Sequence, residues 1–364
     1  MTPRRPTRTA GILILSASFG GAARMVADSL HRYVKTRAGN VDVKLVDLFE
    51  ETMPSLNVLA RFAYQREPSF FPSGFMTWPG YVEAFPANPV ISEVERGGMA
   101  RLEQLLDVTR PAAVVSCFPL GAVLAAHASR SRPMLTAAVA SGFSVRDAAL
   151  HPDTDLHFVA TRESRDELVV AGVPYDRIVV SGIPVPVTDT GSADARPDPG
   201  GFRAVLDGSA PGGSIARVAG VLASAGARVV VTPCGDDRTR RALTEVAVRG
   251  GTVREAGTAA EVTTALLDAS VAVVHGGSLL TVEAVAAGCP VIIYNEIPGL
   301  EMDSVDFLVN AGVALVARDE TDAAEKARFL SAHPGRLAQL TECARGLAKP
   351  LAAQSICERV LAGS

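Results

Sequence analysis

Short, continuously apolar runs alternate with helical segments of ten or more residues along almost the whole of this 364-residue chain. Continuous apolar runs are typical of parallel strands covered on both faces, and their alternation with helices is the signature of βαβ units. We therefore expect doubly wound α/β domains, in which ligands bind at the carboxyl ends of the strands. The predicted strands lie at 11–16, 41–48, 112–118, 134–140, 156–161, 178–182, 202–206, 227–233, 271–274, 290–294 and 313–317.

One stretch near the middle of the chain breaks this alternation. Residues 185–201 contain three prolines and three glycines and few large apolar side chains. That composition is typical of a linker between domains. The sequence therefore predicts an N-terminal domain over 1–184 and a C-terminal domain over 202–349, joined by the linker.

An aromatic-rich insertion at 62–89 is a second departure from the pattern. Eight aromatic residues lie between 62 and 85, among several prolines, which disfavours a regular helix. One interpretation is a loop that packs its rings on the N-terminal domain. The other is an apolar lip, including Phe75 and Trp78, for a hydrophobic acceptor or a membrane surface.

The composition excludes several classes of protein. A formal net charge of −4 argues against general binding to nucleic acid, which favours a basic face. The five cysteines are scattered without a CxxC pair, as expected for free thiols in a reducing cytosol. No apolar run approaches the roughly 18 residues that span a bilayer. We expect a cytoplasmic protein, with any membrane contact peripheral and at the inner face of the cell membrane.

The segment from His275 to Pro290 carries the clearest sign of a binding site. It lies between two apolar runs and predicts a strand, a glycine turn, a helix of about three turns and another strand. The residues Gly276 to Ser278 are expected to leave backbone N–H groups without partners at the helix start, where the helix dipole also favours an anion. Glu283, further along the helix, is placed to accept hydrogen bonds from a sugar hydroxyl beside that phosphate. The sequence thus predicts a sugar-nucleotide pocket, in which His275 either donates to a diphosphate oxygen or has a structural role at the end of the strand.

Three other turns rich in glycine or proline follow predicted strands, at 16–24, 207–214 and 297–304. The first contains Gly20 and Gly21 but does not read GxGxxG, which disfavours dinucleotide binding. The second is either a loop that contacts phosphate or sugar, with Gly213 in it, or a plain strand–helix connection. In the third, Glu301 suits either a helix cap or a ligand for sugar hydroxyls.

Candidates for acid–base chemistry and for metal binding lie close together in the sequence. His151 falls between two predicted strands and is a candidate for acid–base work. The residues Asp153-Thr154-Asp155 match a metal-binding DxD, but they precede a strand instead of following one. We therefore expect no metal site.

The order of these segments resembles that of a known group of enzymes. It runs from the first glycine turn through His151-Pro152, 155–161, 172–174 and 181–185 to the turn at 276–283 and the segment 298–301. The chain resembles the monogalactosyldiacylglycerol synthases and the processive diacylglycerol glucosyltransferases. More distantly, it is similar to the N-acetylglucosaminyltransferase of peptidoglycan synthesis. The resemblance covers most of the chain and is strongest over 151–185 and 270–310.

The resemblance implies the GT-B fold, in which two Rossmann-like domains face each other across a cleft. It places the acceptor on the first domain and a UDP-sugar on the second. It implies an inverting, metal-independent hexosyltransferase that moves a hexose or N-acetylhexosamine to a hydroxyl of a lipid or specialised-metabolite acceptor. The UDP-sugar is then a co-substrate, and no cofactor is expected. The last segment, 350–364, would form a helix that crosses back to the N-terminal domain.

Site residues follow from the resemblance position by position. On the donor side they are His275, Gly276, Gly277, Ser278, Thr281, Glu283, Gly213, Leu300 and Glu301. On the acceptor side they are Gly20, Gly21, Phe75 and Trp78.

Three departures from the family pattern bear on the chemistry. Ala23 stands where the family has a histidine that is a candidate base, Leu300 replaces a glutamine, and Ser304 replaces an asparagine. His151 is then the best candidate for the base, with Asp147 behind it. Two alternatives stay open: a catalytically degenerate, glycosyltransferase-like partner protein, and a UDP-sugar epimerase on the same fold.

Overall fold

The computed structural model describes residues 11–17, 21–52, 89–143, 153–186, 201–209, 214–248, 252–295 and 302–363. The chain forms two compact units, one made of Met1–Pro184 with Leu351–Ser364 and the other of Val185–Pro350. The division after Pro184 lies where the sequence places the end of the N-terminal domain. Most of the predicted linker, from residue 187 to residue 200, lies outside the described residues.

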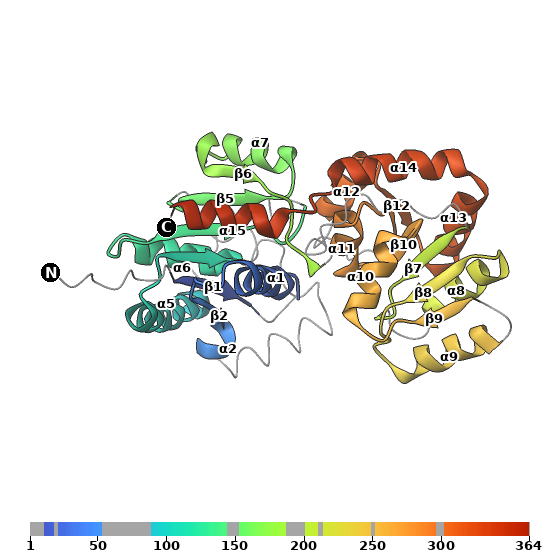
Figure 1. The fold of residues 1–364 in the computed structure, drawn as a ribbon, viewed down its shortest axis with the longest axis horizontal. Coiled ribbons are helices and arrows are strands. Elements are labelled where there is room, and N and C mark those ends of the chain that lie inside the picture. The colour runs from blue at the N-terminus through green and yellow to red at the C-terminus, as the bar shows by residue number, and fades with distance from the viewer. Residues whose placement is uncertain are drawn as a thin grey trace. The chain divides into compact units, whose positions relative to one another are not determined.

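The first unit contains a six-stranded parallel sheet in the order β2-β1-β3-β4-β5-β6, with helices on both faces (Figure 1). Strand β1 is buried along its whole length, which explains its continuous apolar sequence. The elements are β1 (Ile12–Ser16), α1 (Ala22–Arg37), β2 (Val43–Asp47), α2 (Leu48–Thr52), α5 (Pro89–Thr109), β3 (Ala113–Ser116), α6 (Pro119–Ser129), β4 (Leu135–Val139), β5 (Leu156–Val159), α7 (Arg162–Val170), the 3₁₀ turn η4 (Tyr175–Arg177), β6 (Ile178–Val180) and α15 (Ala352–Gly363).

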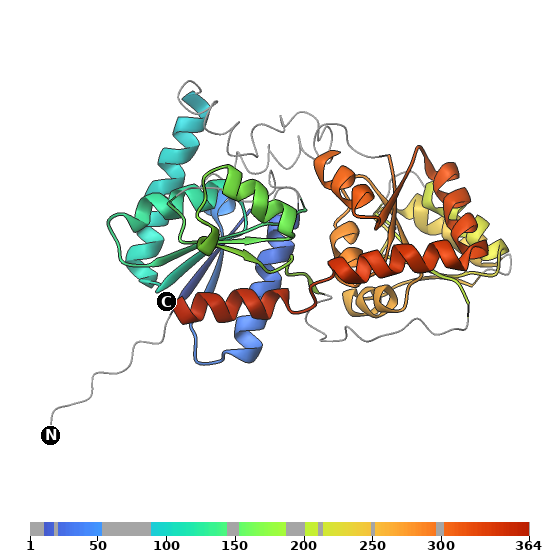
Figure 2. The ribbon, with the colours of Figure 1, turned by 90° about the horizontal axis from the view of Figure 1, so that it is seen from above.

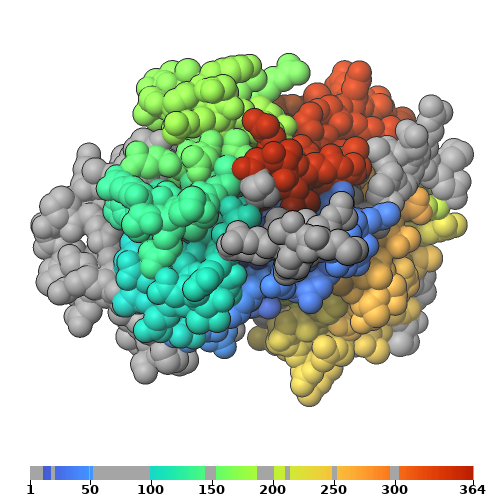
Figure 3. All heavy atoms as spheres, turned by 60° about the vertical axis from the view of Figure 1, so that its left-hand side comes forward, coloured from blue at the N-terminus to red at the C-terminus, as the bar shows by residue number. Residues whose placement is uncertain are grey.

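Helix α15 brings the end of the chain back to the first unit. Its buried residues recur at helical spacing and form one apolar stripe: Ala352, Ala353, Ile356, Cys357 and Val360. The stripe packs against α1 and β4, and the helix lies beside α1 in Figure 2. Its other face forms part of the surface seen in Figure 3. This is the return of the chain that the resemblance implies.

The second unit repeats the architecture of the first. Its sheet has the order β12-β11-β10-β7-β8-β9, and every neighbouring pair is parallel. One face packs on α8 and α13 around a cluster that includes Leu206, Val231 and Val273, while α10 and α11 contact the central strands. The elements are β7 (Arg203–Leu206), α8 (Ser214–Ser224), β8 (Arg228–Val231), α9 (Asp237–Val248), β9 (Val253–Glu255), α10 (Ala259–Leu267), β10 (Val271–His275), α11 (Leu280–Ala286), β11 (Val291–Tyr294), α12 (Met302–Asn310), β12 (Ala314–Ala317), α13 (Glu320–Ala332) and α14 (Pro334–Leu347).

The sequence predicts eleven of the twelve described strands and misses β9. This strand has three residues and lies at the edge of the sheet, where Arg254 and Glu255 are exposed. An edge strand of this kind needs no apolar run, because only one neighbour and one face bury it. None of the described helices is long and apolar enough to cross a membrane.

Candidate functional site

The connection of the strands creates a switch point between β7 and β10 in the second sheet. From β7 the chain runs outward through β8 to β9, then returns to β10 on the other side of β7 and continues to β12 (Figure 1). The loops that follow β7 and β10 therefore leave the sheet in opposite directions, and such a point opens a crevice at the carboxyl ends of the strands. Asp207 directly follows β7, and His275 ends β10.

The turn after β10 differs from its prediction in detail. Helix α11 begins at Leu280 and has seven residues, about two turns in place of three. The N–H of Gly276 donates to the carbonyl of Tyr294 at 2.9 Å, and the N–H of Ser278 donates to the carbonyl of His275 at 3.2 Å. The expectation that both groups are free is therefore wrong, because the first extends the sheet ladder and the second closes the turn.

Two N–H groups of this turn remain available to a ligand. Those of Gly277 and Leu279 make no hydrogen bond to any described residue, and Gly277 is exposed. Gly277 has a φ of 80°, in the left-handed region that favours glycine. The hydroxyl of Ser278 accepts from the N–H of Leu280, in the first turn of the helix, at 3.1 Å. Thr281, in that turn, is half-buried.

Both ring nitrogens of His275 have partners within the protein. Nδ1 lies 2.5 Å from the carbonyl oxygen of Gly276. Nε2 lies 3.1 Å from Oγ of Ser209 and 3.4 Å from Oδ2 of Asp207. The ring therefore joins the loop after β7 to the turn after β10, and in this arrangement neither nitrogen points freely toward a ligand.

Asp207 is a buried carboxylate to which the sequence assigns no role. Its Oδ1 accepts from the N–H of Ser209 at 2.9 Å and from the hydroxyl of Ser209 at 2.7 Å. Its Oδ2 is buried and makes no hydrogen bond to the described residues. An acidic residue directly after a buried strand at a switch point is the signal that could have found it.

Close backbone packing fixes the start of the loop after β7. The N–H of Gly208 donates to Oγ1 of Thr232 at 2.9 Å. A Cβ atom at position 208 would lie 2.1 Å from the carbonyl oxygen of Thr232. Only glycine fits there, and the loop is held against the end of β8.

Glu283 lies on α11 beside this group. Burial, with a further contribution from the negative charge of Asp207, raises the pKa of Glu283 to about 7. Two carboxyl groups in one partly buried site are typical of a functional position.

Tyr294, at the end of β11, adds a buried hydroxyl that the sequence did not single out. Burial raises the pKa of Tyr294 to about 12, while the side chain of Ser214, at the start of α8, favours a lower pKa. The next residue, Asn295, has a φ of 50°, so the chain turns sharply away from the strand there.

Many of the predicted site residues lie outside the described part of the chain. These are Gly20, Phe75, Trp78, Asp147, His151, Gly213, Leu300 and Glu301. On the acceptor side, Gly21 precedes α1 with a φ of 72°, and its carbonyl accepts from the N–H of Met25 at 2.9 Å. Ala23, at the position of the family histidine, is buried in the first turn of α1.

The DxD-like segment has a structural role. Oδ2 of Asp155 accepts from both the N–H and the hydroxyl of Thr136, each at 2.8 Å, and so ties the start of β5 to β4. Asp153 forms an ion pair with Arg130. Within the described ranges, no group of three histidine, cysteine or acidic residues is placed to hold a metal ion.

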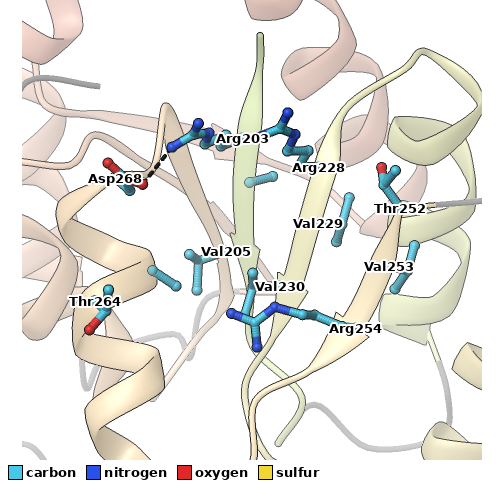
Figure 4. Close-up of a pocket in the computed structure, with 12 residues that line it drawn as sticks. Arg203, Val205, Arg228, Val229, Val230, Thr252, Val253, Arg254, Thr264 and Asp268 are labelled. Carbon is cyan, nitrogen blue, oxygen red and sulfur yellow. Dashed lines mark hydrogen bonds and ion pairs between the residues drawn. The ribbon is translucent and has the colours of Figure 1, made fainter. Parts of the chain in front are cut away.

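A surface groove of about 560 Å³ in the second unit lies away from this site. Arg203 and Arg228, the first residues of β7 and β8, line it together with Val205, Val230 and Arg254 (Figure 4). It therefore reaches the amino ends of two strands, opposite to the ends that bind ligands in such sheets. Arg203 contacts Asp268 at 2.5 Å across the groove, a pair that ties α10 to β7.

The comparisons with known proteins agree with the resemblance seen in the sequence. Residues 24–185 match the family described as "Monogalactosyldiacylglycerol (MGDG) synthase". A processive diacylglycerol beta-glucosyltransferase of Bacillus mycoides is 26% identical, over 96% of this chain and 93% of the relative.

Solved structures show the same fold at low sequence identity. The UDP-GlcNAc 2-epimerase of Neisseria meningitidis has a TM-score of 0.61 at 13% identity and covers 96% of this chain and 99% of its own. The MurG of Acinetobacter baumannii has a TM-score of 0.58 at 13% identity and covers 97% of this chain and 99% of its own. The two parallel sheets and these likenesses confirm the predicted GT-B fold. By its likenesses in sequence and in fold, the chain is a GT-B glycosyltransferase.

Proposed function

We propose that this glycosyltransferase moves a hexose or N-acetylhexosamine from a UDP-sugar to a hydroxyl of a diacylglycerol-like lipid, with inversion and without a metal. The observation that carries the donor assignment is the switch point of the second sheet. There Asp207, His275 and Glu283 gather beside a glycine turn with available N–H groups. The lipid acceptor is supported by the sequence matches, since the family and the relative are both named for diacylglycerol lipids.

In the proposed complex, the N–H groups of Gly277 and Leu279 bind the diphosphate of the donor. Their partial positive charges counter the charge that develops on the leaving UDP. Glu283 accepts hydrogen bonds from the ribose hydroxyls. These bonds favour the ionised carboxyl, so UDP is expected to lower the pKa of Glu283 from about 7 when it binds.

The reaction forms a bond between the acceptor oxygen and the anomeric carbon while the bond from that carbon to the diphosphate breaks. UDP leaves with the electron pair of the broken bond, and a base takes the proton of the acceptor hydroxyl. His151 is the candidate base, with Asp147 behind it, and both lie outside the described residues. A lipid acceptor also gives a reason for peripheral contact with the inner face of the cell membrane, at which Phe75 and Trp78 are the candidates.

The first experiment tests the donor. Purified full-length chain is heated with and without UDP, and UDP is expected to raise the unfolding temperature of the wild type. Glu283→Ala is expected to abolish that protection, whereas Glu342→Ala, at an exposed position on α14, leaves it intact. No effect of UDP on the wild type would contradict the proposal.

The second experiment tests the reaction. The chain is incubated with UDP-glucose, UDP-galactose or UDP-N-acetylglucosamine and with vesicles that contain diacylglycerol, and products are identified by mass spectrometry. A glycosylated diacylglycerol is expected. Bound UDP without turnover would favour the partner-protein alternative, for which the buried Ala23 at the family's histidine position is the supporting observation. Conversion of a UDP-sugar without acceptor would favour an epimerase.

A further inference from the structure

The buried carboxylate of Asp207 is a polar group of the second unit to which the proposed reaction assigns no chemical step. The residue is 3% exposed, and its Oδ1 is occupied by Ser209. Its Oδ2 has no hydrogen bond to the described residues, and Nε2 of His275 lies 3.4 Å away. A buried carboxylate is costly unless a donor or a positive charge compensates it, and the imidazole of His275 is the group placed to do so.

The opposite nitrogen of the same ring acts on the glycine turn. Nδ1 lies 2.5 Å from the carbonyl oxygen of Gly276, which can only accept, so Nδ1 carries a hydrogen. Oδ2 of Asp207, on the side of Nε2, also only accepts, so the ring compensates this carboxylate in the form with a hydrogen on both nitrogens, which is positively charged. That carbonyl and the N–H of Gly277 belong to one trans peptide, in which C=O and N–H point in opposite directions. A ring that holds the carbonyl of Gly276 therefore also fixes the direction of the N–H of Gly277.

We propose that Asp207 is a positioning residue for the donor diphosphate, and that it acts through His275 on the peptide between Gly276 and Gly277. The inference rests on the proposed function and changes one role in it. His275 orients the N–H that binds the diphosphate and does not bind the diphosphate itself. Asp207 and Ser209 together hold the ring from the side of β7. The loop after β7 and the turn after β10 are therefore held together across the switch point.

The test compares ligands that differ only in phosphate. Affinities for UDP, UMP and uridine are measured by calorimetry on the full chain, for the wild type and for Asp207→Asn. Asparagine keeps the size of the side chain and an oxygen for Ser209 but removes the charge that faces His275. We expect the affinity for UDP to fall roughly tenfold, because charge-assisted hydrogen bonds are the strong ones, while the affinity for uridine stays within about twofold.

A double-mutant cycle tests the route through His275. If Asp207 acts through the ring, Asp207→Asn has no further effect on UDP affinity in a His275→Gln background. His275→Gln alone is also expected to lose affinity for UDP and to keep its affinity for uridine. This variant can therefore test the inference if Asp207→Asn does not fold. Asp319→Asn is the matched control, since Asp319 caps α13 through the N–H groups of Thr321 and Asp322 and is expected to leave all three affinities unchanged.

The outcomes separate this inference from the proposed function. Absence of UDP binding to the wild type would contradict the proposed function. Wild-type UDP binding with an unchanged Asp207→Asn would overturn the positioning role alone. Equal loss of UDP and uridine affinity, or additive effects in the cycle, would also overturn it.

Discussion

The two sheets share one architecture, yet their described strand ends carry different chemistry. In each unit six parallel strands reverse their order once, between β1 and β3 in the first and between β7 and β10 in the second. At the second switch point Asp207 and His275 face each other, and Glu283 lies near. At the first, the side chains of Ser16 and Ser116 are buried and carry no charge.

Polar side chains at the described strand ends of the first sheet form hydrogen bonds with backbone groups. Oγ of Ser116 donates to the carbonyl of Phe118 at 2.8 Å, and Oδ1 of Asp47 accepts from the N–H of Glu50 at 3.0 Å. Thr161 caps α7 through the N–H of Ser164. The first switch point thus has uncharged serines where the second has titratable side chains, so the residues at the strand ends, and not the fold, set the chemistry of each.

The largest expected effect tests how rigidly the second crevice is built. Gly208→Ala would place a Cβ atom against the backbone carbonyl of Thr232, which cannot rotate away, so we expect a loss of about 3 kcal/mol in the free energy of unfolding. In the first unit, Gly121→Ala meets the side chains of Ser116 and Phe118, which can move, so its loss is expected to be smaller. Urea unfolding of both variants measures the difference, and equal losses would show that the two crevices are equally rigid.

The next prediction concerns pH and Glu283. Its pKa in the folded protein is raised from 4.5 to about 7, so the neutral form stabilises the fold fully below pH 4.5, and that contribution is lost as the pH rises through 7. Glu283→Gln imitates the neutral form and is expected to raise the free energy of unfolding by about 1–3 kcal/mol at pH 8.5, with little effect at pH 4.5. Urea titrations at the two values check this, and a gain that is the same at both would contradict the assignment.

A smaller effect separates backbone strain from ligand binding. Gly277 and Gly21 have similar positive φ values, 80° and 72°, in the second and first units. Alanine at either position is expected to cost about 1–2 kcal/mol in the free energy of unfolding. Only Gly277→Ala is expected to weaken UDP binding, which calorimetry measures. A similar loss of UDP affinity in Gly21→Ala would remove the distinction between the two crevices.

The smallest expected effects come from two threonine caps. Thr161 in the first unit is buried and contacts both the N–H and the hydroxyl of Ser164 at 3.0 Å. Thr258 in the second unit accepts a single exposed N–H, that of Glu261, at 3.2 Å. Alanine is expected to cost about 1–2 kcal/mol at position 161 and about 0.5 kcal/mol at position 258. Thermal unfolding ranks the two variants, and the reverse order would show that burial does not decide the strength of these caps.

The sequence alone determined the layers of the fold. Continuous apolar runs identify parallel strands wherever both faces are buried, and they fail only at β9, an exposed edge. The same pattern located the turn at 275–278, because glycines after a buried strand are a local feature. The sequence determined the length of α11 less well, because this helix has seven residues where the sequence predicts about three turns.

Tertiary structure decided which groups in that turn are available. The N–H of Gly276 is taken by Tyr294, a residue of the neighbouring strand, and the ring of His275 is held by Asp207 and Ser209, about seventy residues earlier in the chain. No local pattern contains such partners, because strand order brings them together. The sequence thus determined that a glycine turn follows β10. Only the packing of β7 beside β10 places His275 against the buried carboxylate of Asp207. That contact is favourable because Oδ2 of Asp207 is buried and has no hydrogen bond to the described residues.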